Sequence, residues 1–202
     1  MLADDSALAS AWRFLASYWP RVLGISAALL LPCFWHRHIQ AGDLGSHLYN
    51  AWLAQLIEAG KVPGLYLATQ FSNVLFDISL LHLANFFGFW LAEKIAVSAC
   101  VLIFFWGVFA FVSAVSDDAQ WILMPCIATL AYGYAFNMGF MNYYLSLGLG
   151  ASCLSLVWPA TVWSRKEADW IIAVLLLVLA WLAHPIGCLW ALATIAYIAA
   201  RN

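Results

Sequence analysis

Six apolar runs, separated by short polar segments, constrain this chain more than any other feature. They lie near residues 21–36, 89–115, 121–136, 143–163, 169–184 and 186–200. Of the 202 residues, 66% are hydrophobic and only 9% are charged, whereas a soluble domain carries about 25% charged residues. So few charges cannot cover a water-facing surface, and a membrane span needs about 20 apolar residues. The sequence therefore predicts an all-α integral membrane protein.

We expect a single transmembrane domain over residues 1–202, with five to six transmembrane helices. Residues 1–20 are amphipathic and are expected to lie on the membrane surface. Residues 21–36 form the first span, a retained signal anchor, and residues 37–88 form an outer loop. Residues 89–202 hold the remaining spans. The last two apolar runs meet at His184-Pro185, which favours two short helices over one kinked span.

The few charges predict an orientation. Arg13 and Arg21 precede the first span, and Lys and Arg near a span favour the cytoplasmic side, so the N-terminus is expected inside. Counting spans from there puts three polar stretches on the outer face: residues 37–88, residues 137–142 and His184-Pro185. The net charge is −2, and the sequence has no basic patch, which excludes nucleic acid as a partner. Membrane lipid is the partner that the composition predicts.

The outer loop is expected to contain two interfacial, juxtamembrane helices. The first begins near Asp43 or Ser46, which are good N-cap residues, and ends at Gly60. A broad apolar stripe covers one side of this helix, while His47 and Asn50 lie on the other. The second helix is expected from about residue 72 to residue 89.

Asp43 and His47 are the first candidates for a reaction site. They are four residues apart, so on a helix their side chains point the same way. A carboxylate beside an imidazole suits general-base chemistry near neutral pH, or binds a divalent ion together with a phosphate. The plain structural alternative is that Asp43 caps the helix, where the dipole also favours it, and that His47 is merely solvated.

Further polar residues stand out against apolar surroundings. Asp77 is flanked by hydrophobic residues and is either a second acidic group facing the same outer cleft or a surface residue at the headgroup level. His184 forms a polar spot at a proline break, or is simply a hydrogen-bonded histidine there. For Glu93 and Lys94 we expect structural roles, pairing with a neighbouring helix and reaching to the interface.

Four short motifs carry a resemblance to a known family. They are Gly-Asp-Leu-Gly-Ser-His-Leu-Tyr-Asn at residues 42–50, Pro-Gly-Leu-Tyr at 63–66, Tyr-Ala-Phe-Asn-Met-Gly-Phe-Met-Asn-Tyr at 134–143 and Leu-Ala-His-Pro at 182–185. Their placement after a first span resembles the GT-C superfamily of polytopic membrane glycosyltransferases, especially uncharacterised bacterial members. The resemblance implies a chain in the bacterial inner membrane that takes its sugar from a polyprenyl-phosphate donor.

The resemblance also implies roles for individual residues. Asp43 matches the acidic position of the first outer loop, a catalytic base or metal-linked carboxylate, with a divalent metal ion as its cofactor in the second case. His47 and Asp77 are the further catalytic candidates, and Asn50, Lys61 and His184 are the substrate-binding candidates. Members of the family have more spans than this chain, so we expect a member shortened at its C-terminus. The alternative function is a non-catalytic membrane protein: a degenerate relative, an assembly factor or part of a transporter.

Overall fold

The computed structural model describes residues 7–158 and 167–201, and almost all of its ordered elements are α-helices. The elements are α1 (Ala7–Trp35), α2 (Leu44–Glu58), α3 (Leu75–Ser116), the 3-10 turn η1 (Trp121–Leu123), α4 (Met124–Ala131), α5 (Tyr134–Asn137), α6 (Met141–Val157), α7 (Glu167–Ala183) and α8 (Pro185–Arg201). No strand occurs in these two ranges. The all-α prediction is therefore confirmed for the described residues.

In the part of the chain that the structure describes, two helices are long and apolar enough to cross a membrane. They are α1, over residues Trp12–Trp35, and α3. The helices α7 and α8 are also apolar, but each has only 17 residues, which is the lower end of the length that spans a bilayer. The expected total of five to six spans therefore stays a prediction.

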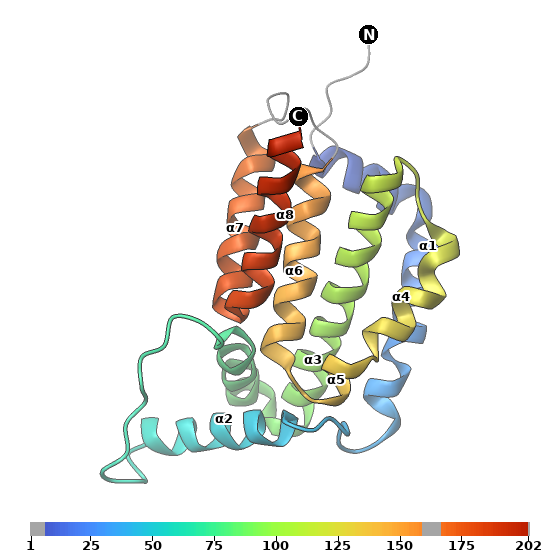
Figure 1. Cartoon of the computed structure of the whole chain (residues 1–202). Helices are drawn as coiled ribbons and strands as arrows, with labels where there is room; N and C mark the ends of the chain where they lie inside the picture. The colour runs from blue at the N-terminus through green and yellow to red at the C-terminus, as the bar shows by residue number, and fades with distance from the viewer. Residues whose placement is uncertain (1–6, 159–166, 202) are drawn as a thin grey trace.

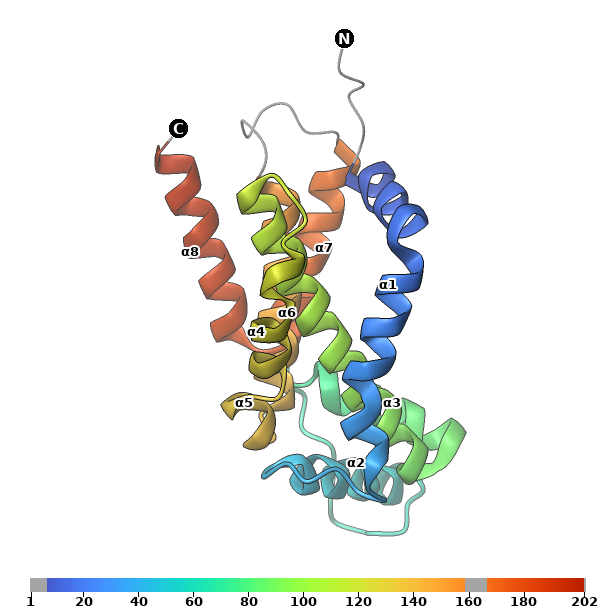
Figure 2. The same ribbon diagram turned by 90° about the vertical axis from the view of Figure 1, so that its right-hand side faces the viewer.

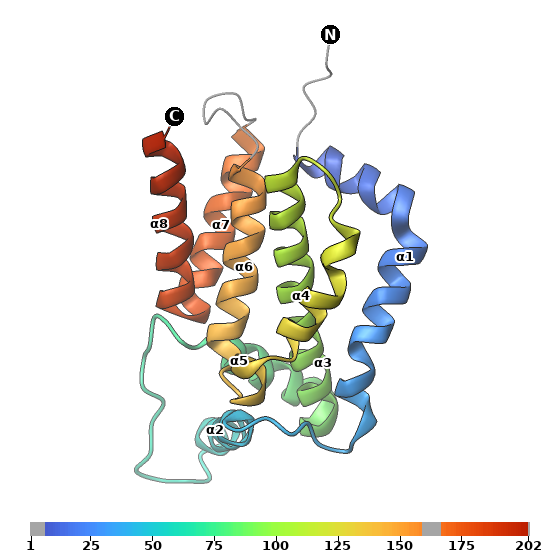
Figure 3. The same ribbon diagram turned by 45° about the vertical axis from the view of Figure 1, so that its right-hand side comes forward.

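The helix α1 joins two segments that the sequence analysis separated. It continues from Ala7 to Trp35 through Pro20 and Pro32, so the expected surface piece and the expected first span belong to one helix. Figures 2 and 3 show this helix bending in its N-terminal half. Proline removes a backbone donor and bends a helix without necessarily ending it.

A glycine divides α3 into two parts. Gly88 has φ 75° and ψ 161°, a backbone conformation that residues with a Cβ essentially never adopt. Residues 75–87 therefore form the second helix predicted for the 37–88 segment, close to its predicted range, and residues 89–116 form the long apolar helix that follows. By contrast, the apolar run at 121–136 is not one helix, because it is divided into η1, α4 and α5.

The long helices form a bundle, and α2 lies across one end of it (Figure 1). Within the bundle α6 packs against α3, α7 and α8. The start of α1 and the end of α8 lie at the opposite end from α2 (Figure 1). The His184-Pro185 junction separates α7 from α8, as two short helices were expected to meet there.

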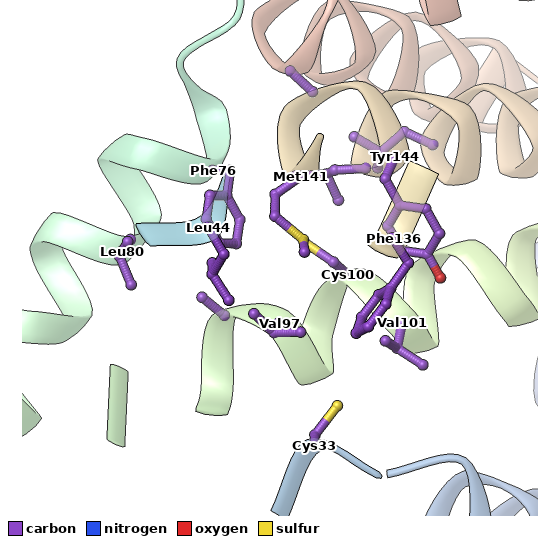
Figure 4. Close-up of a cluster of buried hydrophobic side chains, with 14 of the residues drawn as sticks. Cys33, Leu44, Phe76, Leu80, Val97, Cys100, Val101, Phe136, Met141 and Tyr144 are labelled. Carbon is purple, nitrogen blue, oxygen red and sulfur yellow. The ribbon is translucent and has the colours of Figure 1, made fainter. Parts of the chain in front are cut away.

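The buried core ties α2 to the bundle. Figure 4 shows Leu44 of α2 in the same cluster as Phe76 of α3, Met141 and Tyr144 of α6, and Cys33 of α1. All five side chains are almost fully buried. Fully burying a large apolar side chain stabilises a fold by about 1.5–3 kcal/mol. This cluster therefore holds the start of α2 firmly against α3 and α6, which fixes the position of the polar residues beside it.

Candidate functional site

The three polar stretches that the sequence placed on one face meet at one end of the bundle. Two hydrogen bonds join the start of α2 to the α5–α6 turn: Gly42 N–H donates to the Asn137 carbonyl and Asp43 N–H to the Met138 carbonyl, each at 2.9 Å. The Val74 N–H, just before α3, donates to the Leu182 carbonyl of α7 at 2.9 Å. Residues far apart in the chain are thus brought into one polar neighbourhood.

Gly139 makes this close approach possible. Its φ is +75°, and a Cβ at this position would lie 2.4 Å from the Asp43 backbone nitrogen and 2.6 Å from that of Leu44. Such distances are far shorter than any packing contact allows, and the neighbouring atoms belong to the backbone. The turn can therefore press against the first residues of α2 only because position 139 lacks a side chain.

His47 and Asp77 form the centre of the site. The Nδ1 atom of His47 lies 2.6 Å from Oδ1 of Asp77. The second Asp77 oxygen, Oδ2, accepts a hydrogen bond of 2.6 Å from Nδ2 of Asn142. The side chains of His47 and Asp77 are 12% and 26% exposed, so both are partly shielded but reachable from solvent. The three residues come from α2, α3 and α6, so helix packing assembles them.

Asp43 occupies the N-cap position of α2 but does not cap the helix with its side chain. No side-chain hydrogen bond to the backbone of the first turn is present, and the side chain is 49% exposed. Its Oδ2 lies 4.0 Å from Nε2 of His47, which is too far for a direct hydrogen bond. The Asp43 carboxylate therefore lies at the solvent-exposed side of the site, and the His47 imidazole is more deeply buried.

The surroundings of His47 favour its charged form. Burial by itself disfavours the imidazolium, but the hydrogen bond and charge of Asp77, the charge of Asp43 and a hydrogen bond to the Gly139 backbone outweigh it, so the pKa of His47 is raised. An imidazole with an ordinary pKa of about 6.5 titrates close to physiological pH. The charge of Asp77 therefore holds a proton on His47 more firmly than on a free imidazole, and a carboxylate-supported imidazole is a common general acid or base.

These residues border an open cleft of about 390 Å³, within the size range of small-molecule sites. Its lining residues come from four different segments: Asp43, His47, Asn73, Phe140, Asn142, Tyr143, His184 and Ile186. The His184 ring lies edge-on to Tyr143, with centroids 5.4 Å apart, and its Nδ1 accepts a hydrogen bond from Ile186 N–H at 3.2 Å. Burial lowers the pKa of His184, so this imidazole is neutral at neutral pH and its Nε2–H is left as a donor.

Four of the six predicted site residues thus share one neighbourhood, and two lie elsewhere. Asp43, His47 and His184 line the cleft, and Asp77 is bonded to His47 directly behind it. Asn50 is exposed on α2 and does not line the cleft. Lys61 lies beyond the far end of α2, a helix of 15 residues, and at 1.5 Å per residue that places it about 20 Å from the site.

Asn142 belongs to the site, although it was not among the six residues predicted for it. In the sequence it was only part of the polar stretch 137–142 expected on the outer face. In the structure it lies in the first turn of α6, and its side chain is buried at 2% exposure. Its position at the start of an apolar run does indicate a structural or functional role, because a buried amide must find hydrogen-bond partners. The sequence could not show which partners those are.

Glu93 and Lys94 form a second charged cluster, which we call the buried clasp. Both side chains are 1% exposed. Glu93 accepts a hydrogen bond of 2.6 Å from Ile39 N–H and lies 3.2 Å from Nδ1 of His38. Lys94 donates to the His36 carbonyl at 2.8 Å. The clasp thus fastens the segment after α1 to α3, so both residues have structural roles. The expected details were wrong: Lys94 is buried and does not reach to an interface, and Glu93 bonds to the segment at His38 and Ile39 and not to a neighbouring helix.

Resident metal ions are usually held by several grouped side chains. Within residues 7–158 and 167–201, no three His, Cys, Asp or Glu side chains are grouped as metal ligands. Asp43 and Nε2 of His47 face the cleft, whereas both Asp77 oxygens are already bonded.

No family model, no curated protein and no solved structure matches this chain.

Proposed function

We propose that this chain is a membrane-embedded glycosyltransferase of the GT-C type, or part of one, that takes a sugar from a polyprenyl-phosphate donor. The observation that carries the proposal is the carboxylate–imidazole–carboxylate arrangement of Asp43, His47 and Asp77 beside an open cleft. Structural polar groups are usually saturated with partners, but here a carboxylate and an imidazole nitrogen face the cleft. We place the cleft at the outer face of a bacterial inner membrane, with the N-terminus in the cytoplasm.

The apolar surface of the bundle supports a membrane setting. Large apolar side chains on α7 and α8 are exposed, including Ile171 at 61%, Leu175 at 56% and Leu189 at 55%. Soluble proteins rarely expose a continuous apolar surface of this kind, whereas lipid covers it at no cost. In this setting the polyprenyl tail of the donor stays in the lipid, and its headgroup and the acceptor meet in the cleft at the water boundary.

The proposed reaction is a single displacement with inversion. The acceptor hydroxyl lies between Asp43 and His47, and this pair removes its proton as the oxygen forms a bond to the anomeric carbon. The bond from that carbon to the phosphate oxygen breaks, and the electron pair leaves with polyprenyl phosphate. The Nε2–H of His184 is positioned to donate a hydrogen bond to the phosphate. A positioned general base contributes about 10²–10⁴-fold to such a rate.

The direct test uses the full chain in lipid nanodiscs with a set of polyprenyl-phosphate hexoses. We expect the protein to release polyprenyl phosphate and transfer the sugar to a hydroxyl acceptor. The variant Asp43→Asn keeps the side-chain shape, and we expect it to slow transfer by about 10²-fold or more. Glu58→Gln makes the same chemical change at an exposed position on the same helix and should leave the rate unchanged. Undiminished transfer by Asp43→Asn would sink the proposal.

A non-catalytic membrane protein is the second candidate, and one observation favours it. The hydrogen bonds of Asp77 and Asn142 connect α2, α3 and α6, so they also stabilise this end of the bundle. In that case the wild-type protein would neither bind nor cleave any of the donors, and Asp77→Asn would change only the thermal stability. Binding of a polyprenyl-phosphate sugar that is lost in Asp43→Asn, but not in Glu58→Gln, would exclude this candidate.

A further inference from the structure

Asn142 links the backbone at the start of α3 to the centre of the site. Its side-chain oxygen accepts a hydrogen bond of 2.8 Å from Phe76 N–H. Its Nδ2 donates to the Asn73 carbonyl at 3.1 Å and to Oδ2 of Asp77 at 2.6 Å. At 2% exposure this residue is almost fully buried, and these three protein groups satisfy its amide.

The two backbone groups fix which way the Asn142 amide points. An N–H group only donates and a carbonyl only accepts, so the amide oxygen must face Phe76 and the amide NH₂ must face Asn73. The second hydrogen of that NH₂ then points at Asp77. The usual ambiguity between the two ends of an asparagine amide is removed here by partners whose own roles cannot change.

The fixed direction of donors and acceptors extends from Asn142 through Asp77 to His47. Because Oδ2 of Asp77 accepts from Asn142, the remaining oxygen, Oδ1, is the one that faces Nδ1 of His47 at 2.6 Å. An ionised carboxylate only accepts hydrogen bonds, so Nδ1 carries a proton. In the neutral imidazole Nε2 then holds the lone pair. That nitrogen is on the side of Asp43 and the cleft.

We propose that Asn142 is a positioning residue, which acts through Asp77 to hold His47 with its proton on Nδ1 and its Nε2 lone pair available to the substrate. The inference rests on the proposed sugar transfer and identifies His47 as its general base. The hydroxyl proton of the sugar-accepting molecule goes to Nε2 of His47 as its oxygen bonds to the anomeric carbon. The bond from that carbon to the phosphate oxygen breaks in the same step. Asp43, which is more exposed, then orients the acceptor hydroxyl and does not itself take the proton.

Two variants separate this role from a structural one. Asn142→Asp keeps an oxygen for Phe76 N–H but replaces the donor toward Asp77 with a second acceptor. Asp77→Asn keeps the shape of the side chain, and its oxygen can still accept from Asn142. Its own NH₂ would then face Nδ1 of His47 and donate to it, which forces the ring proton onto Nε2. An Asp→Asn change of this kind leaves geometry intact and gives the wrong tautomer.

The experiment is ¹⁵N NMR of the histidine rings in the full chain, in nanodiscs, with the His47 signal assigned by its loss in His47→Gln. In the wild type, above the pKa of His47, we expect the proton on Nδ1. In Asp77→Asn we expect it on Nε2, and in Asn142→Asp a mixture of both forms. Transfer should fall about 10–100-fold in kcat in Asn142→Asp, the range for groups that orient a functional residue, with little change in KM.

The outcomes distinguish this inference from the proposed function. A wild-type His47 with its proton on Nε2, or the same tautomer in the wild type and Asp77→Asn, would overturn the positioning role. The expected tautomers in a protein that transfers no sugar would support the positioning role and reject the proposed function. If Asn142→Asp does not fold, the comparison of Asp77→Asn with the wild type decides alone.

Discussion

The cleft cluster (Asp43, His47 and Asp77) and the buried clasp (Glu93 and Lys94) are two charged groups in one apolar protein, but their environments differ. In the clasp both side chains are fully buried, and their hydrogen bonds go to the segment after α1. In the cleft cluster Asp43 is half-exposed, and Nε2 of His47 faces the cleft 4.0 Å from the nearest carboxylate oxygen. A charge beside hydrocarbon must be paired or used. In the clasp both charged groups are engaged in hydrogen bonds to the backbone, whereas the cleft cluster keeps part of its hydrogen-bonding capacity for a ligand.

The largest expected effect is on transfer, in the cleft cluster. His47→Gln removes the proton acceptor, and we expect kcat to fall about 10³-fold, which corresponds to about 4 kcal/mol of transition-state stabilisation. The melting temperature should change little, because glutamine can still bond to Asp77. His82→Gln, at an exposed position of α3, is the matched control. A His47→Gln enzyme within twofold of the wild-type rate would remove the distinction between the two clusters.

The clasp should show the opposite behaviour. Glu93→Ala leaves Ile39 N–H without its acceptor, and leaving a buried hydrogen-bonding group unsatisfied costs about 1–3 kcal/mol of folding free energy. We expect a clear loss of thermal stability in detergent, with kcat per folded molecule unchanged. If Glu93→Ala instead lowered kcat at full stability, the clasp would belong to the functional site.

Gly139 connects the cleft cluster to the fold, and the next prediction compares it with another glycine. Gly139→Ala places a Cβ against the backbone of Asp43 and adds strain at a positive φ, so we expect a loss of about 2 kcal/mol or more. Gly45 lies in α2, and no atom lies within 4 Å of the place that a Cβ would take there. Gly45→Ala should therefore stabilise the protein by up to about 1 kcal/mol through helix propensity. Equal melting temperatures for the two variants would contradict the close packing at residue 139.

The smallest expected effect is the pH dependence of stability. The pKa of His47 is raised in the folded protein, mainly by Asp77 acting against burial. The resulting stabilisation is fully present below the unfolded pKa of about 6.5 and is lost as the pH rises through the higher folded pKa. Asp77→Asn removes the main cause, so its stability deficit relative to the wild type should be largest at acidic pH. A deficit that grows from about pH 6 to pH 9 would contradict the sign of this coupling.

The raised pKa of His47 also predicts how kcat depends on pH. If His47 accepts the proton, only its neutral form is active, so kcat should rise with pH through a value above the ordinary pKa of histidine. Asp77→Asn should move this rise to lower pH, since it removes a group that stabilises the imidazolium. A rate profile that is identical in the two proteins would assign the proton to another group.

Local sequence signals predicted the elements that depend on local chemistry. The all-helical class followed from apolar runs and the scarcity of charge. The helix predicted from Asp43 or Ser46 to Gly60 is α2, observed over Leu44–Glu58. The run at 121–136 looked equally continuous, yet it forms the 3-10 turn η1 leading directly into α4, and then a turn before the short helix α5. A run of apolar residues indicates a segment that is buried in lipid or protein. It does not show where the helices within that segment begin and end.

The sequence by itself determined that Asp43 and His47 share one side of a helix, because four residues make about one helical turn. Only the tertiary structure decided that His47 meets Asp77, which lies 30 residues away, and that Asn142 fixes Asp77 from a further 65 residues along the chain. Helical periodicity acts over a few residues, whereas these contacts depend on the packing of α2, α3 and α6 and on a glycine that lets a turn approach the backbone of α2. The polar residues were visible in the sequence, and their order as a hydrogen-bonded series was not.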